Sequence, residues 1–104
     1  MIHAAVTVRN DRILGIEVSG HADSADYGED LVCAEVSAVT TGLCNAIDEA
    51  GFNAEMVVEA GHVAIAAQND DSHDLQIMLK TGVAQLKTIE FTNSEFIKVT
   101  YTEV

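Results

Sequence analysis

Two residues in the first third of the sequence, Cys33 and His21, have side chains of the types that perform nucleophilic chemistry. A cysteine thiolate attacks carbonyl carbons, and a histidine is the side chain best suited to remove the thiol proton near neutral pH. The two residues are close in the chain, and each is near a glycine, Gly20 or Gly28. If the fold brings the ring to the sulfur, this pair predicts acyl-transfer chemistry through a covalent thioester.

A long helix is the element expected to position Cys33. From Val32 to Ala50, apolar residues recur at three- and four-residue steps, which is the spacing of an apolar helix face. Asp30 can cap the first turn, and Gly51 suits the left-handed conformation that ends helices. Cys33 then lies in the first turn, where backbone amides lack intrahelical partners and the helix dipole is positive. This position favours the thiolate over the thiol and offers amides to an oxyanion.

Each of these residues also has an ordinary structural explanation. Free cysteine is among the most buried residue types and often acts only as a small apolar side chain. Helix capping alone accounts for Asp30, although its carboxylate could also orient His21 as the third member of a triad. Ser37, one turn after Cys33, either supports the site or hydrogen-bonds back to a backbone carbonyl. Spacing alone leaves both interpretations open.

The same stretch carries a dense motif, Gly20-His21-Ala22 followed by Gly28-Glu29-Asp30-Leu31-Val32-Cys33-Ala34 and Val36-Ser37-Ala38. It resembles the ribosomal-processing cysteine proteases, the Prp family. The resemblance implies a hydrolase, a thiol protease, that removes a short N-terminal extension from a large-subunit ribosomal protein during ribosome biogenesis. It implies Cys33 as nucleophile and His21 as general base, with Asp30 and Ser37 as orienting or supporting residues. Beyond about Gly51 only the overall pattern is similar.

The segment that links His21 to the helix is polar, small and poor in apolar anchors. On composition alone it is equally well a simple connector or a mobile lid over bound peptide. The family resemblance favours a substrate-binding loop, in which Tyr27 either packs on the substrate or anchors the loop. The loop residues are Ala22, Asp23, Ser24, Ala25, Asp26, Tyr27 and Gly28.

The composition is strongly acidic, with 17 acidic and 5 basic side chains and a net charge of −12. Such a surface opposes nucleic-acid binding, which depends on Lys and Arg, and favours a basic protein partner. The sign fits the precursor of a basic ribosomal protein, although acidity also serves solubility alone. A non-catalytic dimeric module that binds a basic protein through this surface is therefore the alternative function. It predicts a slowly reacting Cys33.

The 104 residues fit one domain, residues 1–104. No apolar run of about 20 residues and no basic-then-apolar N-terminal region is evident, so we expect a cytoplasmic protein without membrane binding. Cys44 follows Cys33 by eleven positions on the predicted helix, about 16 Å along its axis, which is too far for a disulfide. Close metal-ligand spacings and phosphate-binding glycine loops are also missing. We therefore predict free thiols, with Cys44 in the core, and neither metal nor cofactor.

The whole chain predicts a two-layer α+β fold with the element order β-β-α-β-β-α-β. Two helices are expected to pack against a mainly antiparallel five-stranded sheet. A homodimer is expected because two-fold pairs dominate soluble oligomers. The expected strands are Ile2–Arg9, Ile13–Ser19, Ala54–Ala60, His62–Gln68 and Glu95–Glu103, and the second helix follows a loop and cap at Asn69–Ser72.

Overall fold

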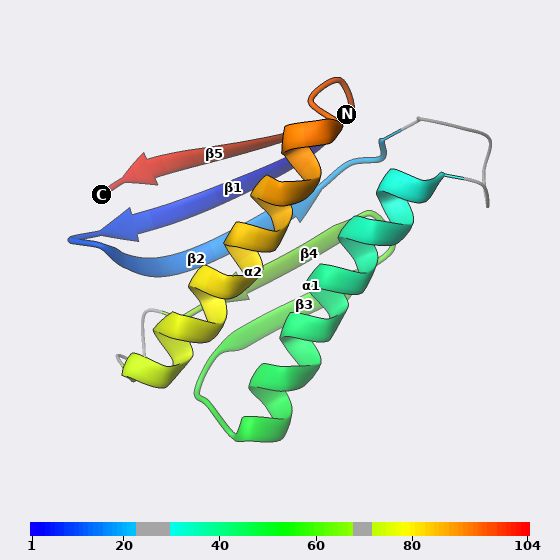
Figure 1. The fold of residues 1–104 in the computed structure, drawn as a ribbon. Helices are drawn as coiled ribbons and strands as arrows, with labels where there is room; N and C mark the ends of the chain where they lie inside the picture. Colours follow the sequence, from blue (N-terminus) through cyan, green and yellow to red (C-terminus); the bar gives the residue numbers. More distant parts are fainter. Residues whose placement is uncertain (23–29, 68–71) are drawn as a thin grey trace.

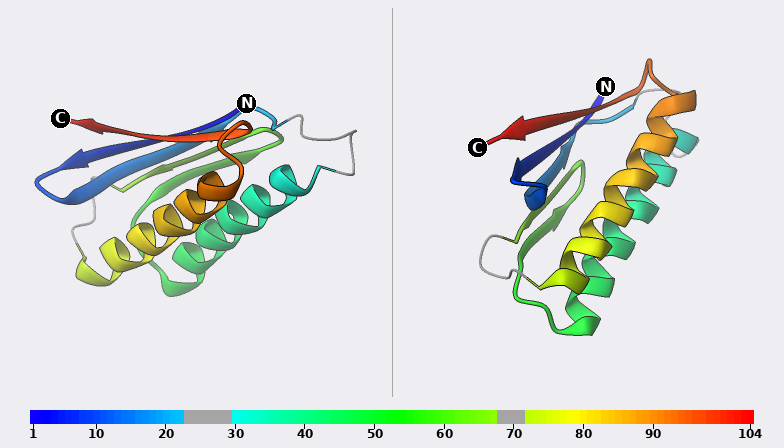
Figure 2. Two further views of the ribbon diagram at one scale, coloured as in Figure 1. Left: turned by 45° about the horizontal axis from the view of Figure 1, so that its top comes forward. Right: turned by 60° about the vertical axis from the view of Figure 1, so that its left-hand side comes forward.

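The computed structural model describes residues 1–22, 30–67 and 72–104. These residues form a five-stranded sheet with two helices on one of its faces (Figure 1), and Figure 2 shows that the opposite face is not covered by a helix. The predicted two-layer α+β fold and its element order are confirmed. The elements are β1 (Ile2–Arg9), β2 (Arg12–Ser19), α1 (Leu31–Ala50), β3 (Glu55–Glu59), β4 (His62–Ala66), α2 (His73–Thr92) and β5 (Ile97–Glu103).

The strands lie in the order β3-β4-β2-β1-β5. Three of the four pairings are antiparallel, as predicted, and β5 pairs with β1 in parallel. The tight β1–β2 turn has Asn10 and Asp11 at φ 50° and 66°, a conformation that matches the twist of a hairpin. β5 begins later than predicted because the amides of Phe96 and Ile97 both donate to the carbonyl of Asn93, which forms a turn before the strand.

The alternating burial of side chains along β1 shows which face of the sheet packs against the helices. Ile2, Ala4 and Val6 are buried, whereas His3 and Ala5 between them are exposed. Side chains of a strand point alternately to its two faces, so the buried set lies on the helix side. The helices complete this core with the buried residues Val32, Val36, Cys44 and Ile47 of α1 and Leu75, Leu79, Val83 and Leu86 of α2.

Both predicted ends of α1 are confirmed. The Asp30 side chain accepts a hydrogen bond from the Cys33 amide at 3.0 Å, which caps the first turn. Gly51 takes the left-handed conformation, with φ 77°, and ends the helix. Cys33 is therefore the third residue of the helix, in the turn where the backbone amides face outward.

By length and composition, α1 is long and apolar enough to cross a membrane, although the sequence predicts no membrane binding. In the fold its apolar stripe, including Val32, Val36 and Ile47, is buried against the sheet and α2. A core helix meets the same criteria of length and composition. The position of α1 is thus explained by core packing, which also fixes its first turn relative to the end of β2.

A buried glutamine holds the other helix in place. Gln76 of α2 is 6% exposed and pairs with both backbone groups of Ile13 in β2. Its Oε1 accepts from the Ile13 amide at 2.7 Å, and its Nε2 donates to the Ile13 carbonyl at 2.8 Å. Both polar ends of the side chain are satisfied, so burial carries no unpaired-group penalty. This pair fixes the register of α2 on the hairpin.

Candidate active site

The sulfur of Cys33 lies where the first turn of α1 meets the chain that leaves β2. The residue is half-buried, and its Sγ accepts a hydrogen bond from the backbone amide of Ala22 at 3.2 Å. Its own amide is engaged by the Asp30 carboxylate. A backbone donor aimed at a sulfur stabilises negative charge on it, and the positive end of the helix acts in the same direction. The surroundings of the sulfur are thus polar on one side, unlike those of a core cysteine.

The backbone at His21 is held from two sides. Its carbonyl accepts a hydrogen bond from the Met1 amino group at 2.7 Å, and the amide of the preceding Gly20 donates to the Gly61 carbonyl at 3.0 Å. Gly61 belongs to the turn between β3 and β4, which lies near the start of α1 in Figure 1. Two segments that are distant in the sequence, the N-terminus and the β3–β4 turn, therefore hold the chain at this histidine.

The imidazole of His21 lies directly against Gly61. A β-carbon added to Gly61 would come within 2.9 Å of Nε2 and 3.1 Å of Cε1 of the ring. Real β-carbons essentially never approach other atoms below 3.0 Å, so any side chain at this position would displace the ring. Gly61 also has φ +72°, a conformation that favours glycine. A glycine between two strands was visible in the sequence, but its contact with His21 was not.

His21, Cys33 and Ser37 all line one cavity of about 260 Å³. Ser37 is one turn below Cys33 on α1, as predicted from the spacing. Ile2, Val18 and Val36 and residues of the β3–β4 turn form other parts of the wall. The described part of the chain also has a larger hollow, of about 580 Å³, but no cysteine or histidine lines it, so thiol chemistry points to the smaller cavity.

The structure tests one of the two possible roles of Asp30. Its capping of α1 is confirmed, whereas its part in orienting His21 stays a prediction. The predicted substrate-binding loop lies almost entirely outside the described residues, since Asp23, Ser24, Ala25, Asp26, Tyr27 and Gly28 fall in the segment 23–29. Of that loop only Ala22 is described. It is buried at 3% exposure, and its amide is the donor to Cys33.

The second cysteine has a different environment. Cys44 is 4% exposed in the core, and burial raises the pKa of its thiol. Both cysteines are free, as predicted. In the ranges 1–22, 30–67 and 72–104, no group of three or more His, Cys, Asp or Glu side chains is arranged to hold a metal ion. Among the described residues, the candidate reactive groups are therefore the half-buried Cys33 thiol and the His21 imidazole, which line the same cavity.

Comparison with known proteins agrees with this chemistry. The sequence model of a family described as cysteine protease Prp matches residues 1–98 of the chain. The chain belongs to this family. It is a cysteine protease, which confirms the enzyme interpretation over the non-catalytic module.

Named relatives and a solved structure cover nearly the whole chain. The ribosomal processing cysteine protease Prp of Staphylococcus aureus (strain Mu50) is 34% identical over 107 residues, covering 97% of this chain and 99% of the relative. The Bacillus subtilis (strain 168) protein of the same name is 32% identical, with 96% of both chains covered. A crystal structure of Prp from S. aureus in complex with a covalently linked product peptide has a TM-score of 0.92 and 32% identity, covering 98% of this chain and 100% of that one.

Proposed function

We propose that this protease removes the N-terminal extension from the precursor of a large-subunit ribosomal protein, with Cys33 as nucleophile and His21 as general base. The single observation that supports this assignment best is the shared cavity, in which the half-buried sulfur and the imidazole both form part of the wall. The relatives carry the name ribosomal processing protease, and the S. aureus structure holds a covalently linked product peptide. Both facts concern those proteins and make the same target reasonable here.

In this mechanism the imidazole of His21 takes the proton of the Cys33 thiol, and the thiolate attacks the scissile carbonyl carbon. The tetrahedral intermediate collapses when the imidazolium gives its proton to the leaving amine, which breaks the C–N bond and leaves a thioester. Water, deprotonated by the same imidazole, then hydrolyses the thioester and restores the thiol. No metal or further cofactor takes part in this scheme.

Backbone amides would stabilise the oxyanion. The Cys33 amide is engaged by Asp30, so we assign this role to the amides of Leu31 and Val32 at the start of α1 together with that of Ala22. Ala22 donates to the sulfur before reaction. As the C–S bond forms, negative charge moves from sulfur to the carbonyl oxygen, and the Ala22 amide is near enough to follow it.

Proton transfer requires a small rearrangement in this scheme. In the described part of the chain, the hydrogen-bond donor to the Cys33 sulfur is the Ala22 amide and not the imidazole. Catalytic hydrogen bonds in ligand-free enzymes are often long and tighten only when substrate binds. The ring of His21 lies at an exposed position against Gly61, so it can turn towards the sulfur without disturbing the core.

The charge of the protein suits the proposed substrate. A net charge of −12 attracts a basic ribosomal precursor and repels nucleic acid, so we expect the enzyme to act on the free protein. We propose that it works in the cytoplasm, where reducing conditions keep both thiols free, and away from membranes. A homodimer fits the general preference for two-fold assemblies.

The experiment is cleavage of an extended ribosomal precursor, with the product N-terminus determined by mass spectrometry. Wild-type protein should release the extension at one site, and Cys33→Ala should lose at least roughly 10³-fold of the rate while keeping its circular dichroism spectrum. Cys44→Ala is the matched control and should retain cleavage. Cleavage by Cys33→Ala at the wild-type rate would rule out this mechanism. Cleavage only at internal sites would remove the proposed target and leave the mechanism standing.

A further inference from the structure

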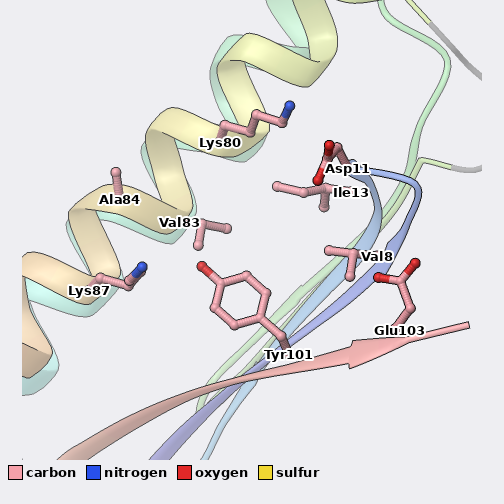
Figure 3. A pocket seen from close by; sticks show the side chains of 9 residues that line it. All are labelled: Val8, Asp11, Ile13, Lys80, Val83, Ala84, Lys87, Tyr101 and Glu103. Atoms are coloured by element: carbon pink, nitrogen blue, oxygen red, sulfur yellow. The ribbon is translucent and has the colours of Figure 1, made fainter.

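A second hollow lies between α2 and the strands β1, β2 and β5 (Figure 3). Its volume is about 580 Å³, more than twice that of the cavity beside Cys33 at about 260 Å³. The two share none of the lining residues that the structure describes. This hollow lies beside the β1–β2 turn, whereas the start of α1 is at the other end of the sheet (Figure 1). It therefore needs an explanation of its own.

The floor of the hollow is apolar and includes an aromatic ring. Val83 of α2 and Ile13 of β2 are buried beneath it. Tyr101 of β5 is 51% exposed, and in Figure 3 its hydroxyl points towards α2. A half-exposed ring beside buried aliphatic groups offers a flat surface on which a planar apolar group can stack. The shape and lining suit a small organic molecule rather than a metal ion.

Two lysines border the hollow on its helix side. Lys80 and Lys87 are seven residues apart on α2, about two turns, so they lie on the same face of the helix. They are two of only five basic side chains in a chain of net charge −12. The ion pairs found among the described residues join His62 to Glu17 and to Glu59, and neither lysine takes part in one. Lys87 instead lies over the Tyr101 ring, 5.6 Å from its centroid.

Among the described residues that line the hollow, the acidic ones are Asp11 and Glu103, on the strand side. Glu103 already accepts a hydrogen bond from the Asn10 amide at 3.1 Å, so its carboxylate helps to close the β1–β2 turn. Asp11 belongs to the turn itself. In Figure 3 the Lys80 ammonium points towards Asp11, whereas the Lys87 ammonium lies beside α2 and Tyr101, away from both carboxylates. A bound anion would be drawn to the α2 side.

We propose that this hollow binds a small organic anion that carries a planar apolar group. The anionic group would lie between Lys80 and Lys87, and the planar group would stack on Tyr101 and Val83. Ammonium groups act as point charges without a preferred geometry, so the site selects for charge and shape and not for one kind of anionic group. The net negative charge of the protein repels anions elsewhere, which favours this hollow, where two lysines meet an apolar floor.

The test uses anilinonaphthalene sulfonate, a planar anion whose fluorescence rises on binding, and neutral phenylnaphthylamine as the uncharged comparison. The sulfonate should bind the wild type more tightly than the neutral compound does. Lys80→Gln and Lys87→Gln should each weaken its binding about five-fold, and the double variant more. Lys98→Gln, an exposed lysine of β5 outside the hollow, changes the net charge equally and should leave binding unchanged.

When the sulfonate is added to the wild type, the amide chemical-shift changes in NMR spectra should concentrate at Lys80, Val83, Lys87 and Tyr101. All three lysines are exposed, so thermal melts of the glutamine variants should match the wild type. Equal affinity for the charged and neutral compounds, equal binding by all three single variants, or shifts confined to the Cys33 cavity would each overturn the proposal. Absence of sulfonate binding up to millimolar concentration would do so as well.

Discussion

The two cysteines of α1 show how position along one helix changes the same side chain. Cys33 is in the first turn, half-buried on a cavity, with the Ala22 amide 3.2 Å from its sulfur. Cys44 is three turns later, 4% exposed in the core, and burial raises the pKa of its thiol. Amides in a helix interior are used by the helix itself, whereas those of the first turn are not. Only the first position offers a sulfur both backbone donors and access.

Alkylation should show the largest contrast between the two cysteines. Iodoacetamide at neutral pH should modify Cys33 first and Cys44 at least about 100-fold more slowly, because a core thiol reacts only when the structure opens locally and such opening costs several kcal/mol. Peptide mass spectrometry after timed quenching measures both rates in one sample. The Cys44→Ala variant should show an unchanged rate at Cys33. Comparable alkylation rates for Cys33 and Cys44 would show that their positions in α1 do not make the two thiols differ in reactivity.

Substitution of Gly61 tests whether the access of Cys33 to an imidazole matters. Gly61→Ala should displace the His21 ring from the position from which it turns towards the Cys33 sulfur. Cleavage should then fall roughly tenfold or more, because a misplaced general base loses most of its contribution. Gly51→Ala is the matched control, since Gly51 is also left-handed, at φ +77°, but an added β-carbon there meets nothing within 4 Å. Both variants should lose about 1 kcal/mol of stability in urea melts. An equal effect of both on cleavage would reduce the role of Gly61 to backbone strain.

Removal of the Asp30 cap tests how strongly stability and cleavage depend on the first turn of α1. Asp30→Ala should cost about 1 kcal/mol of stability and also slow cleavage several-fold, since the Cys33 amide loses its partner. Ser72→Ala removes the cap of α2, whose side chain accepts from the Leu75 amide at 3.4 Å, and should cost similar stability without slowing cleavage.

Asp30→Ser separates the two roles of the carboxylate. Serine caps a helix nearly as well as aspartate, so stability should be retained. If Asp30 also orients His21 through its charge, cleavage by Asp30→Ser should fall as far as that by Asp30→Ala, and the pH profile of kcat/KM should shift. Full activity of Asp30→Ser would leave capping as the whole role of this residue.

The contrast between the two cysteines also shows how far the sequence could predict the structure. The apolar period, Asp30 and Gly51 predicted both ends of α1, and hence the first-turn place of Cys33 and the interior place of Cys44. Such signals are local, because caps and periodicity act within a few residues. The contacts of the site are not local. The Ala22 amide, the Gly61 turn and the Met1 amino group reach Cys33 and His21 only through the sheet.

Other features escaped prediction for the same reason. The parallel pairing of β5 with β1 depends on where α2 returns the chain, and a strand sequence does not state its partner. The hollow bordered by Lys80, Lys87 and Tyr101 joins α2 to β5 across the fold. Single lysines on a helix surface are ordinary in a sequence, and their shared surroundings become visible only in the folded chain.

The smallest expected effect concerns the interior member of the pair. Because the pKa of Cys44 is raised by burial, the folded state keeps the Cys44 proton at a pH where the unfolded chain has begun to lose it. The unfolded state then binds fewer protons, so this residue leaves stability unchanged below about pH 9 and lowers it as pH rises further, by at most about 1.4 kcal/mol per pH unit. Cys44→Val cannot titrate and should lack this decline. Urea melts of both proteins from pH 7 to about 10.5 measure the difference, and parallel curves would mean that the Cys44 thiol is not shielded by the core.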